Sequence, residues 1–203
     1  MDAAQSATLV TFDGTRPVAT LMPVIWERPA ALAEGSWGRL LGHIAIMNDQ
    51  WQTAAPDAEA LAIVTGPQAY ISPSWYESKA RHGRVVPTWN YEVVHLTGAV
   101  TFHQDPEWLR DVVTRLTRRH ESTRVRPWAV SDAPPEYIDG QLRAIVGVEL
   151  AISLVEAKQK LSQNRSEQDR AGVVAGLRAE SVDPGPAAIA DLMAAQLADQ
   201  DLG

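Results

Sequence analysis

The sequence contains no cysteine among its 203 residues. Disulfides, thiolate nucleophiles, iron–sulfur clusters and cysteine-ligated zinc sites are therefore excluded. No apolar run approaches the roughly 20 residues that a membrane-spanning helix needs. The N-terminal segment also lacks the basic and apolar regions of a signal peptide. We therefore expect a cytoplasmic protein that does not enter a membrane.

Positive charge is also in short supply, because the formal net charge is −7. Phosphate contacts made by basic residues provide most non-specific affinity for DNA, so we predict no direct binding to nucleic acid. The sequence has no Walker loop, glycine-rich dinucleotide motif, zinc-protease pair or nucleophile elbow. The common nucleotide, zinc-protease and hydrolase sites are therefore not indicated.

The pattern of apolar residues favours the α+β class, with a small antiparallel barrel and peripheral helices. Two β-rich runs, Ala7–Phe12 and Pro17–Trp26, are joined by Asp13-Gly14, and this dipeptide between apolar runs predicts a hairpin. Further strands are expected at Trp37–Ile46, Ala60–Thr65, Trp89–Phe102 and Ile145–Val155.

Helix start signals appear in the second half of the chain. Asp105-Pro106-Glu107 combines a capping residue, a first-position proline and an acidic first turn. Pro134-Pro135-Glu136 opens a second helix, and a third is expected at Glu167–Ala179. Asp183-Pro184-Gly185-Pro186 is interpreted as a linker before a short helix, so the predicted domains are 1–180 and 181–203.

The segment Gly66–Tyr91 combines prolines with many aromatic side chains, and we expect a long, ordered connection that lines a pocket. Such a pocket suits a flat, conjugated, anionic ligand. The candidate stacking residues, some of which are expected to belong to the core instead, are Tyr70, Trp75, Tyr76, Trp89 and Tyr91. The candidate partners of anionic groups, with solvated loop cations as the alternative, are Lys79, Arg81 and Arg84.

Three blocks of sequence resemble those of a known family. They read AYISPSWY at Ala69–Tyr76, HGRVVPTWNY at His82–Tyr91 and KLSQNRSEQDRAGVVAGL at Lys160–Leu177. These blocks are similar to the flavin-binding negative transcriptional regulators of the PaiB type, and LGHIAIMNDQW at Leu41–Trp51 is a weaker match. The resemblance covers most of residues 7–178. It implies an FMN-binding split β-barrel and a homodimer with its cofactor near the subunit interface.

The same family includes piperazate synthases, which bind haem and join the two nitrogens of a hydroxylated ornithine to close a six-membered ring. Two departures from the regulator pattern favour this branch. Leu21 stands where the regulators commonly have histidine, and Ile46 stands where they commonly have arginine. Because arginine is a natural phosphate partner, its loss weakens the case for FMN. Both changes make the predicted pocket more apolar, which suits a porphyrin.

Given this resemblance, His43 is the candidate axial ligand of haem iron, since imidazole often has that role. From the residues alone, a hydrogen-bonded histidine on a strand is the more frequent case. Gly42 beside it is expected to leave room for a flat ligand. His95 is the next candidate, because it lies in mid-strand. The remaining histidines are expected in loops or at a helix end: His82, His103 and His120.

Lys160, Gln163 and Asn164 form a polar cluster that has no evident structural role beyond capping the next helix. Lys160 is a candidate acid–base group on condition that it is buried. The predicted catalytic residues are thus His43 and Lys160. The predicted cofactor-binding residues are His43, Tyr70, Trp75, Tyr76, Lys79, Arg84, Trp89, Gln163 and Asn164.

Together these observations predict a homodimeric enzyme that uses haem b and resembles the piperazate synthases, with an N-hydroxylated ornithine as its small-molecule substrate. The runner-up is an FMN-binding transcriptional regulator, and a ligand-binding dimer without catalysis is the third possibility. The acidic charge and the lack of a recognisable helix-turn-helix count against direct DNA contact.

Overall fold

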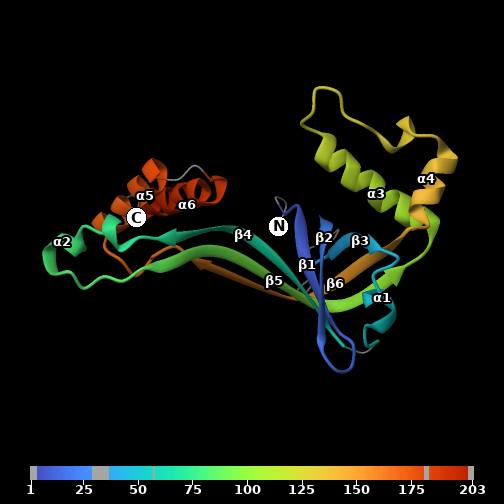
Figure 1. The fold of residues 1–203 in the computed structure, drawn as a ribbon, viewed down its shortest axis with the longest axis horizontal. Coiled ribbons are helices and arrows are strands. Elements are labelled where there is room, and N and C mark those ends of the chain that lie inside the picture. The colour runs from blue at the N-terminus through green and yellow to red at the C-terminus, as the bar shows by residue number, and fades with distance from the viewer. Residues whose placement is uncertain (1–3, 29–36, 57, 181–182, 201–203) are drawn as a thin grey trace. The chain divides into compact units, whose positions relative to one another are not determined.

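The computed structural model describes residues 4–28, 37–56, 58–180 and 183–200. Within them, six antiparallel strands close into a barrel in the order β1-β2-β3-β6-β5-β4 (Figure 1). The strands are β1 Ser6–Phe12, β2 Pro17–Glu27, β3 Arg39–Ala45, β4 Ala60–Ile71, β5 Thr88–His103 and β6 Ile145–Lys160. The helices are α1 Gln50–Thr53, α2 Ser78–His82, α3 Pro106–Glu121, α4 Pro135–Leu142, α5 Glu167–Glu180 and α6 Pro184–Gln200. The predicted α+β barrel is therefore confirmed.

The chain divides into two compact units. The first unit contains residues up to Val64 and His95–Glu156, and the second contains Thr65–Val94 and the residues from Ala157 onward. This division differs from the predicted boundary after residue 180, because strands β4, β5 and β6 each begin in one unit and continue into the other.

The hairpin of the first unit forms where its turn sequence predicts it. Strands β1 and β2 pair from Ser6 opposite Pro23 to Phe12 opposite Pro17. The Asp13 carboxylate accepts hydrogen bonds from the backbone N–H groups of Thr15 and Arg16, both at 2.8 Å. Gly14 has a φ of 94°, which residues with a side chain rarely adopt. The Asp-Gly pair therefore determines this turn.

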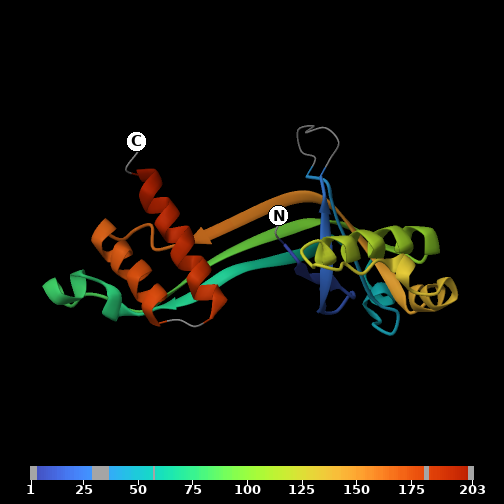
Figure 2. The same cartoon turned by 90° about the horizontal axis from the view of Figure 1, so that it is seen from above.

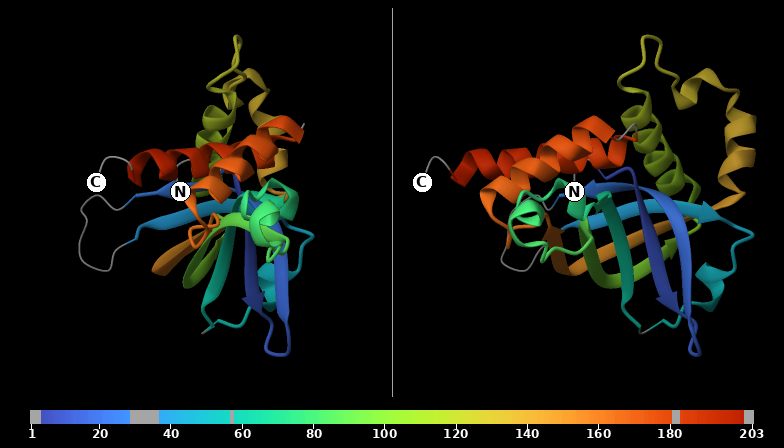
Figure 3. Two further views of the ribbon diagram at one scale, coloured as in Figure 1. Left: turned by 90° about the vertical axis from the view of Figure 1, so that its left-hand side faces the viewer. Right: turned by 60° about the vertical axis from the view of Figure 1, so that its left-hand side comes forward.

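Helix α3 begins as predicted, because the Asp105 side chain accepts a hydrogen bond from the N–H of Glu107 and Pro106 occupies the first turn. Val112 and Leu116 pack against Leu41 of β3, with Ile25 of β2 at the edge of this cluster. Leu109, on a neighbouring part of α3, packs against Ile138 and Leu142 of α4. Helix α3 therefore lies between the outer face of β2 and β3 on one side and α4 on the other (Figure 3).

The long irregular connection predicted at Gly66–Tyr91 is shorter in the structure. Strand β4 runs on to Ile71 and β5 already begins at Thr88. The physical reason is alternation in β4, where Ala69 and Ile71 are buried and Tyr70 between them is exposed. Only residues 72–87 connect the two strands, and they include a short 3₁₀ turn at Pro73–Trp75 and helix α2.

The predicted linker at Asp183-Pro184-Gly185-Pro186 is wrong, because Pro184 already belongs to α6. Ile189, Ala190 and Met193 on α6 are fully buried against α5 residues that include Val173 and Leu177. Figure 2 shows α5 and α6 side by side. The helix is therefore part of the core of the second unit, because its apolar residues form one stripe at helical spacing. Positions 181–182 and 201–203 of the predicted linker and tail lie outside the described residues.

In the part of the chain that the structure describes, no helix is long and apolar enough to span a membrane.

Candidate functional site

His43 lies in strand β3 of the first unit, directly opposite Gly147 of β6. Successive side chains in a strand point to opposite faces. Leu41, two residues before His43, packs beneath α3, so His43 faces the same outer side of the barrel. This position is set by the pairing of β3 with β6, which runs from Arg39 opposite Ala151 to Ala45 opposite Ile145.

The imidazole of His43 is half-buried, and its Nδ1 atom is buried without a hydrogen-bond partner. Burial lowers the pKa of His43 below its ordinary value of 6.5, because the charged form loses hydration. The ring is therefore neutral near pH 7. A neutral imidazole carries one nitrogen lone pair, and a buried nitrogen without a partner is uncommon. His43 thus has the electronic state that a metal ligand needs.

The expected role of Gly42 is wrong. A Cβ atom at this position would lie 2.6 Å from the carbonyl oxygen of Pro23 and 3.2 Å from the sulfur of Met22. The space that a side chain would occupy is therefore already filled by strand β2. Glycine at position 42 allows β2 and β3 to approach closely, and it leaves no room for a ligand.

An aromatic wall lies opposite His43, and sequence reasoning missed it. A Cβ atom at Gly147 would lie 2.1 Å from a ring carbon of Trp108, so the indole sits directly over this glycine. The ring of His103 stacks on Trp108 with centroids 4.1 Å apart, and its Nε2 is 3.2 Å from an oxygen of Glu149. The available signal was a glycine inside an otherwise apolar strand, which often marks such a close approach.

Three arginines near this face are already engaged. Arg39 pairs with Glu27 and Glu149, and Arg115 pairs with Glu27. Arg119 donates to the carbonyl of Val24. Burial alone raises the pKa of Glu27, but the two arginines outweigh it and hold that pKa below its ordinary value. These guanidinium groups therefore neutralise protein carboxylates.

Leu21, one of the two departures from the regulator pattern, is 70% exposed on β2. It follows the alternation in which the next residue, Met22, is buried inside the barrel. Leu21 therefore lies on the outer face of the barrel. Ile46 follows the end of β3, and its carbonyl accepts a hydrogen bond of 3.0 Å from the Trp51 indole.

The other predicted site residues all belong to the second unit, as does Tyr91, whereas His43 and His95 belong to the first. Tyr70 and Trp89 meet edge to face with ring centroids 6.5 Å apart. The Trp89 indole donates a hydrogen bond of 3.0 Å to the side-chain oxygen of Gln68. These half-exposed rings form one aromatic patch on β4 and β5.

Trp75 and Tyr76 serve the core of the second unit. A Cβ atom at Gly176 of α5 would lie 2.4 Å from the Trp75 ring, so this ring packs on the helix backbone. Tyr76 is only 3% exposed, and the guanidinium of Arg165 lies 4.8 Å from its ring centroid. The expectation that some of the aromatic candidates belong to the core is thus met by these two residues.

The predicted polar residues make local contacts. Lys79 donates to the Ser74 hydroxyl at 3.0 Å, and Arg84 is exposed. Lys160 is also exposed and donates to the Thr88 hydroxyl at 2.8 Å, so the burial on which its acid–base role depends is not provided in this chain. Gln163 closes a turn by accepting from the N–H of Leu161, and Asn164 is exposed.

A buried carboxylate in the second unit ties α5 to the connection between β4 and β5. Asp169 accepts hydrogen bonds from both the backbone N–H and the hydroxyl of Ser78, each at 2.8 Å. Burial by itself raises the pKa of Asp169, but the bonds from Ser78 and the charges of Arg165 and Arg81 outweigh it. The pKa of Asp169 therefore lies below its ordinary value of 3.8.

Replacing Asp169 by Asn is expected to destabilise the fold by about 1.5–3 kcal/mol at pH 7, the usual worth of hydrogen bonds to a charged group. In the wild-type protein, the stabilisation that the ionised Asp169 provides is fully present above the pKa that this carboxyl has in the unfolded state. It is lost as the pH falls through the lower folded-state pKa. When urea unfolding is measured between pH 3 and pH 7, the free energy of unfolding should fall less toward acid pH in the variant than in the wild type. Asp191→Asn, an exposed change in the same unit, should leave that loss intact.

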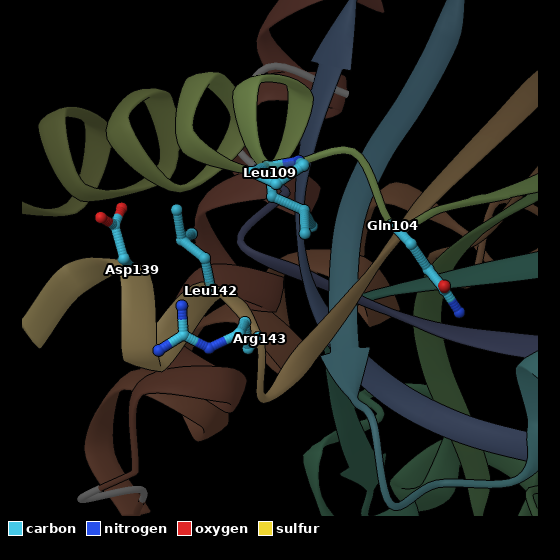
Figure 4. A pocket seen from close by; sticks show the side chains of 6 residues that line it. Gln104, Leu109, Asp139, Leu142 and Arg143 are labelled. Carbon is cyan, nitrogen blue, oxygen red and sulfur yellow. The ribbon is translucent and has the colours of Figure 1, made fainter. Parts of the chain in front are cut away.

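The first unit also contains hollows beside α3. One of about 350 Å³ is lined by Gln104, Pro106, Leu109, Asp139, Leu142 and Arg143 (Figure 4). Its carboxylate is already engaged, because Arg110 donates to Asp139. Among the described residues, no group of three or more histidines and carboxylates is placed to hold a metal ion.

Comparison with known proteins identifies the family. A family model described as "Putative FMN-binding domain" matches residues 1–154. The chain is 32% identical over 193 residues to "Protease synthase and sporulation protein PAI 2" of Bacillus subtilis, covering 95% of this chain and 87% of that protein. It is 30% identical over 192 residues to an uncharacterised protein of Emericella nidulans, covering 81% of this chain and 76% of that protein.

Two solved structures share the fold. The FAD- and haem-binding protein of Mycobacterium smegmatis has a TM-score of 0.52 at 18% identity, covering 84% of this chain and 73% of that chain. A conserved hypothetical protein of Mycobacterium tuberculosis has a TM-score of 0.51 at 13% identity, covering 78% and 79%. The predicted split barrel is therefore confirmed. With its match over residues 1–154 and its similarity to the Bacillus protein, the chain belongs to the FMN-binding domain family that the PaiB-type sequence blocks predicted.

Proposed function

We propose that this protein is a haem-dependent enzyme similar to the piperazate synthases. In this proposal it forms the N–N bond of piperazic acid from an ornithine hydroxylated on its side-chain nitrogen. The observation that carries the proposal is His43, whose buried Nδ1 atom has no hydrogen-bond partner and whose pKa is lowered by burial. A neutral imidazole of this kind is suited to serve as the protein ligand of haem iron.

The surroundings of His43 suit a porphyrin better than a flavin phosphate. Trp108 covers the glycine opposite His43, and Leu21 presents an apolar side chain on the same outer side of the barrel. Arg39, Arg115 and Arg119 are engaged with protein oxygens, so none of these three is spare for a phosphate. The Mycobacterium smegmatis protein of this fold binds haem as well as FAD, which supports haem as a candidate here.

The proposed reaction balances without an external oxidant or reductant. The α-amine nitrogen bonds to the side-chain nitrogen and the N–O bond breaks. The hydroxyl group leaves as water, with its own proton and one proton from the α-amine. Bound haem would supply a Lewis acid for the departing oxygen. The protein would hold the two nitrogens of the substrate close together, which removes much of the entropic barrier.

A homodimer is part of this proposal. Leu21 is 70% exposed and Phe12 is 42% exposed, and both lie on the outer face of the β1–β2 hairpin. Such apolar residues on an open sheet face are suited to contact a second copy. Light scattering should give the mass of a dimer at micromolar concentration, and a monomer would remove the interface model.

An FMN-binding regulator similar to the Bacillus protein is the second candidate. The match to the FMN-binding family over residues 1–154 favours it. A protein of this kind would purify with a yellow flavin and no iron. It would also leave a hydroxylated ornithine unchanged.

The direct activity test is incubation of the haem-loaded protein with N-hydroxylated ornithine, followed by mass spectrometry. We expect a cyclic product that has lost one water. Ornithine without the hydroxyl group should give no product, because it has no N–O bond to break. Haem-loaded protein that leaves the hydroxylated substrate unchanged would contradict the proposed reaction.

A further inference from the structure

Helix α3 and the segment that leads to α4 enclose a groove on the first unit. One part of it, about 270 Å³, is lined by α3 together with Pro127, Trp128, Ala129 and Val130. A second part, about 430 Å³, extends toward Ala133, Pro135 and Ile138. Four residues line both parts: Thr114, Arg118, Ala129 and Val130. The two parts are therefore one continuous groove, of a size that small ligands occupy.

Arg118 lies where the two parts meet, and it differs from the arginines around it. Arg110 pairs with Asp139, and Arg124 pairs with Glu121. Within the described chain, Arg118 is exposed and has neither an ion pair nor a side-chain hydrogen bond. An unpaired guanidinium at the centre of a groove is a natural partner for a carboxylate, because its N–H groups match the two oxygens.

The rest of the groove is mainly apolar. Trp128 is 45% exposed and lines the first part, while Val130, Ala133 and Ile138 provide an aliphatic lining for the second. Glu121 also lines the first part, but both of its oxygens are occupied. One accepts from Arg124 at 2.9 Å and the other from the backbone N–H of Trp128 at 3.0 Å. Glu121 is thus fixed in place to support the segment that carries Trp128.

Local charge supports the same ligand class. The chain as a whole has a net charge of −7, yet residues 110–128 contain six arginines and two acidic residues. Among the charged residues that line the groove, Arg110 is paired with Asp139 and Glu121 is engaged by Arg124 and the Trp128 N–H, so Arg118 is the charge left for an anion. The positive charge of Arg118 favours a ligand with a carboxylate, and the indole of Trp128 favours a ligand with an aromatic ring.

We propose that this groove binds a small aromatic carboxylate, with its carboxylate on Arg118 and its ring against Trp128. The groove shares no lining residue with the proposed haem site around His43 and Trp108, so this proposal does not rest on the haem function. It adds a second small-molecule site to the protein.

Titration calorimetry with indole-3-acetate tests the proposal. We expect a dissociation constant below about 1 mM for the wild-type protein, and at least about tenfold weaker binding for Arg118→Gln. Indole-3-acetamide, which keeps the ring and lacks the charge, should lose affinity to the same extent. Arg126→Gln is the matched control, because Arg126 is exposed nearby and lines neither part of the groove. That variant should bind as the wild type does.

Three results would overturn the proposal. The first is no binding of indole-3-acetate at millimolar concentration, and the second is equal binding of the acetamide. The third is equal weakening by Arg126→Gln, which would indicate general attraction to the basic stretch. Arg118 is exposed, so its replacement should leave the thermal unfolding midpoint unchanged. The comparison of acetate with acetamide on the wild-type protein tests the charge requirement without any variant.

Discussion

His43→Ala is expected to abolish ligation of the haem iron by the protein and to reduce ring-forming activity by at least about 100-fold. Replacing a residue that only hydrogen-bonds to a metal ligand already lowers metal affinity or activity by about 10- to 100-fold. The physical reason is that the variant removes the half-buried, neutral imidazole that faces the outer side of β3. Apolar walls such as Trp108 would still retain part of the haem. Activity and absorption spectrum should therefore be measured together on the same preparation.

Two controls make the His43 result specific. His95→Ala changes a half-buried histidine in β5 of the same unit and should leave the haem spectrum intact. Free imidazole added to the His43→Ala protein should partly restore the wild-type spectrum, because it replaces the missing ligand. An unchanged haem spectrum in His43→Ala would show that the ligand is wrongly assigned, and His95 would then be the next histidine to replace.

Gly147→Ala is expected to destabilise the protein by about 1–3 kcal/mol, the usual cost of overpacking. The added methyl group would lie 2.1 Å from the Trp108 ring, so the indole must move or the strand must shift. Gly140→Ala is the matched control, because a Cβ atom there meets nothing closer than 3.9 Å. Since Gly140 lies within α4, its replacement should stabilise the helix by about 0.4–1 kcal/mol. Urea unfolding of the two variants should give changes of opposite sign.

A double-mutant cycle tests whether Trp108 is the cause. Trp108→Leu removes the ring that occupies the space over Gly147, so Gly147→Ala in that background should cost at least about 1 kcal/mol less than in the wild type. Additive effects of the two changes would contradict the contact. The same variants should alter the haem spectrum if this wall also contacts the cofactor.

Local signals in the sequence predict local structure well. Asp13-Gly14 predicts the first hairpin, and Asp105-Pro106 predicts the start of α3, because each signal acts on the backbone within a few residues. The end of β4 and the place of α6 depend instead on packing. Ile71 and Met193 lie far apart in the chain, and they are buried in the same core of the second unit.

The candidate site also depends on contacts between residues that are far apart in the chain, which the sequence does not predict. His43 stands out in its sequence block, but its partner Gly147 becomes its neighbour only when β3 pairs with β6. Trp108 of α3 then covers Gly147, and the glycine in the strand does not by itself indicate which side chain will cover it. Trp75 and Tyr76 lie in a matching sequence block as well, yet the structure places them against α5 as core residues. A matching sequence block therefore indicates family membership, but it does not distinguish residues that contact a cofactor from residues that pack in the core.

The visible absorption spectrum of the purified protein, measured with its iron content after haem supply, tests the central claim most directly. We predict an intense Soret band and about one iron per chain, because a single neutral His43 can provide the protein ligand for one haem. A yellow flavin spectrum without iron would contradict the haem enzyme and favour the FMN-binding regulator.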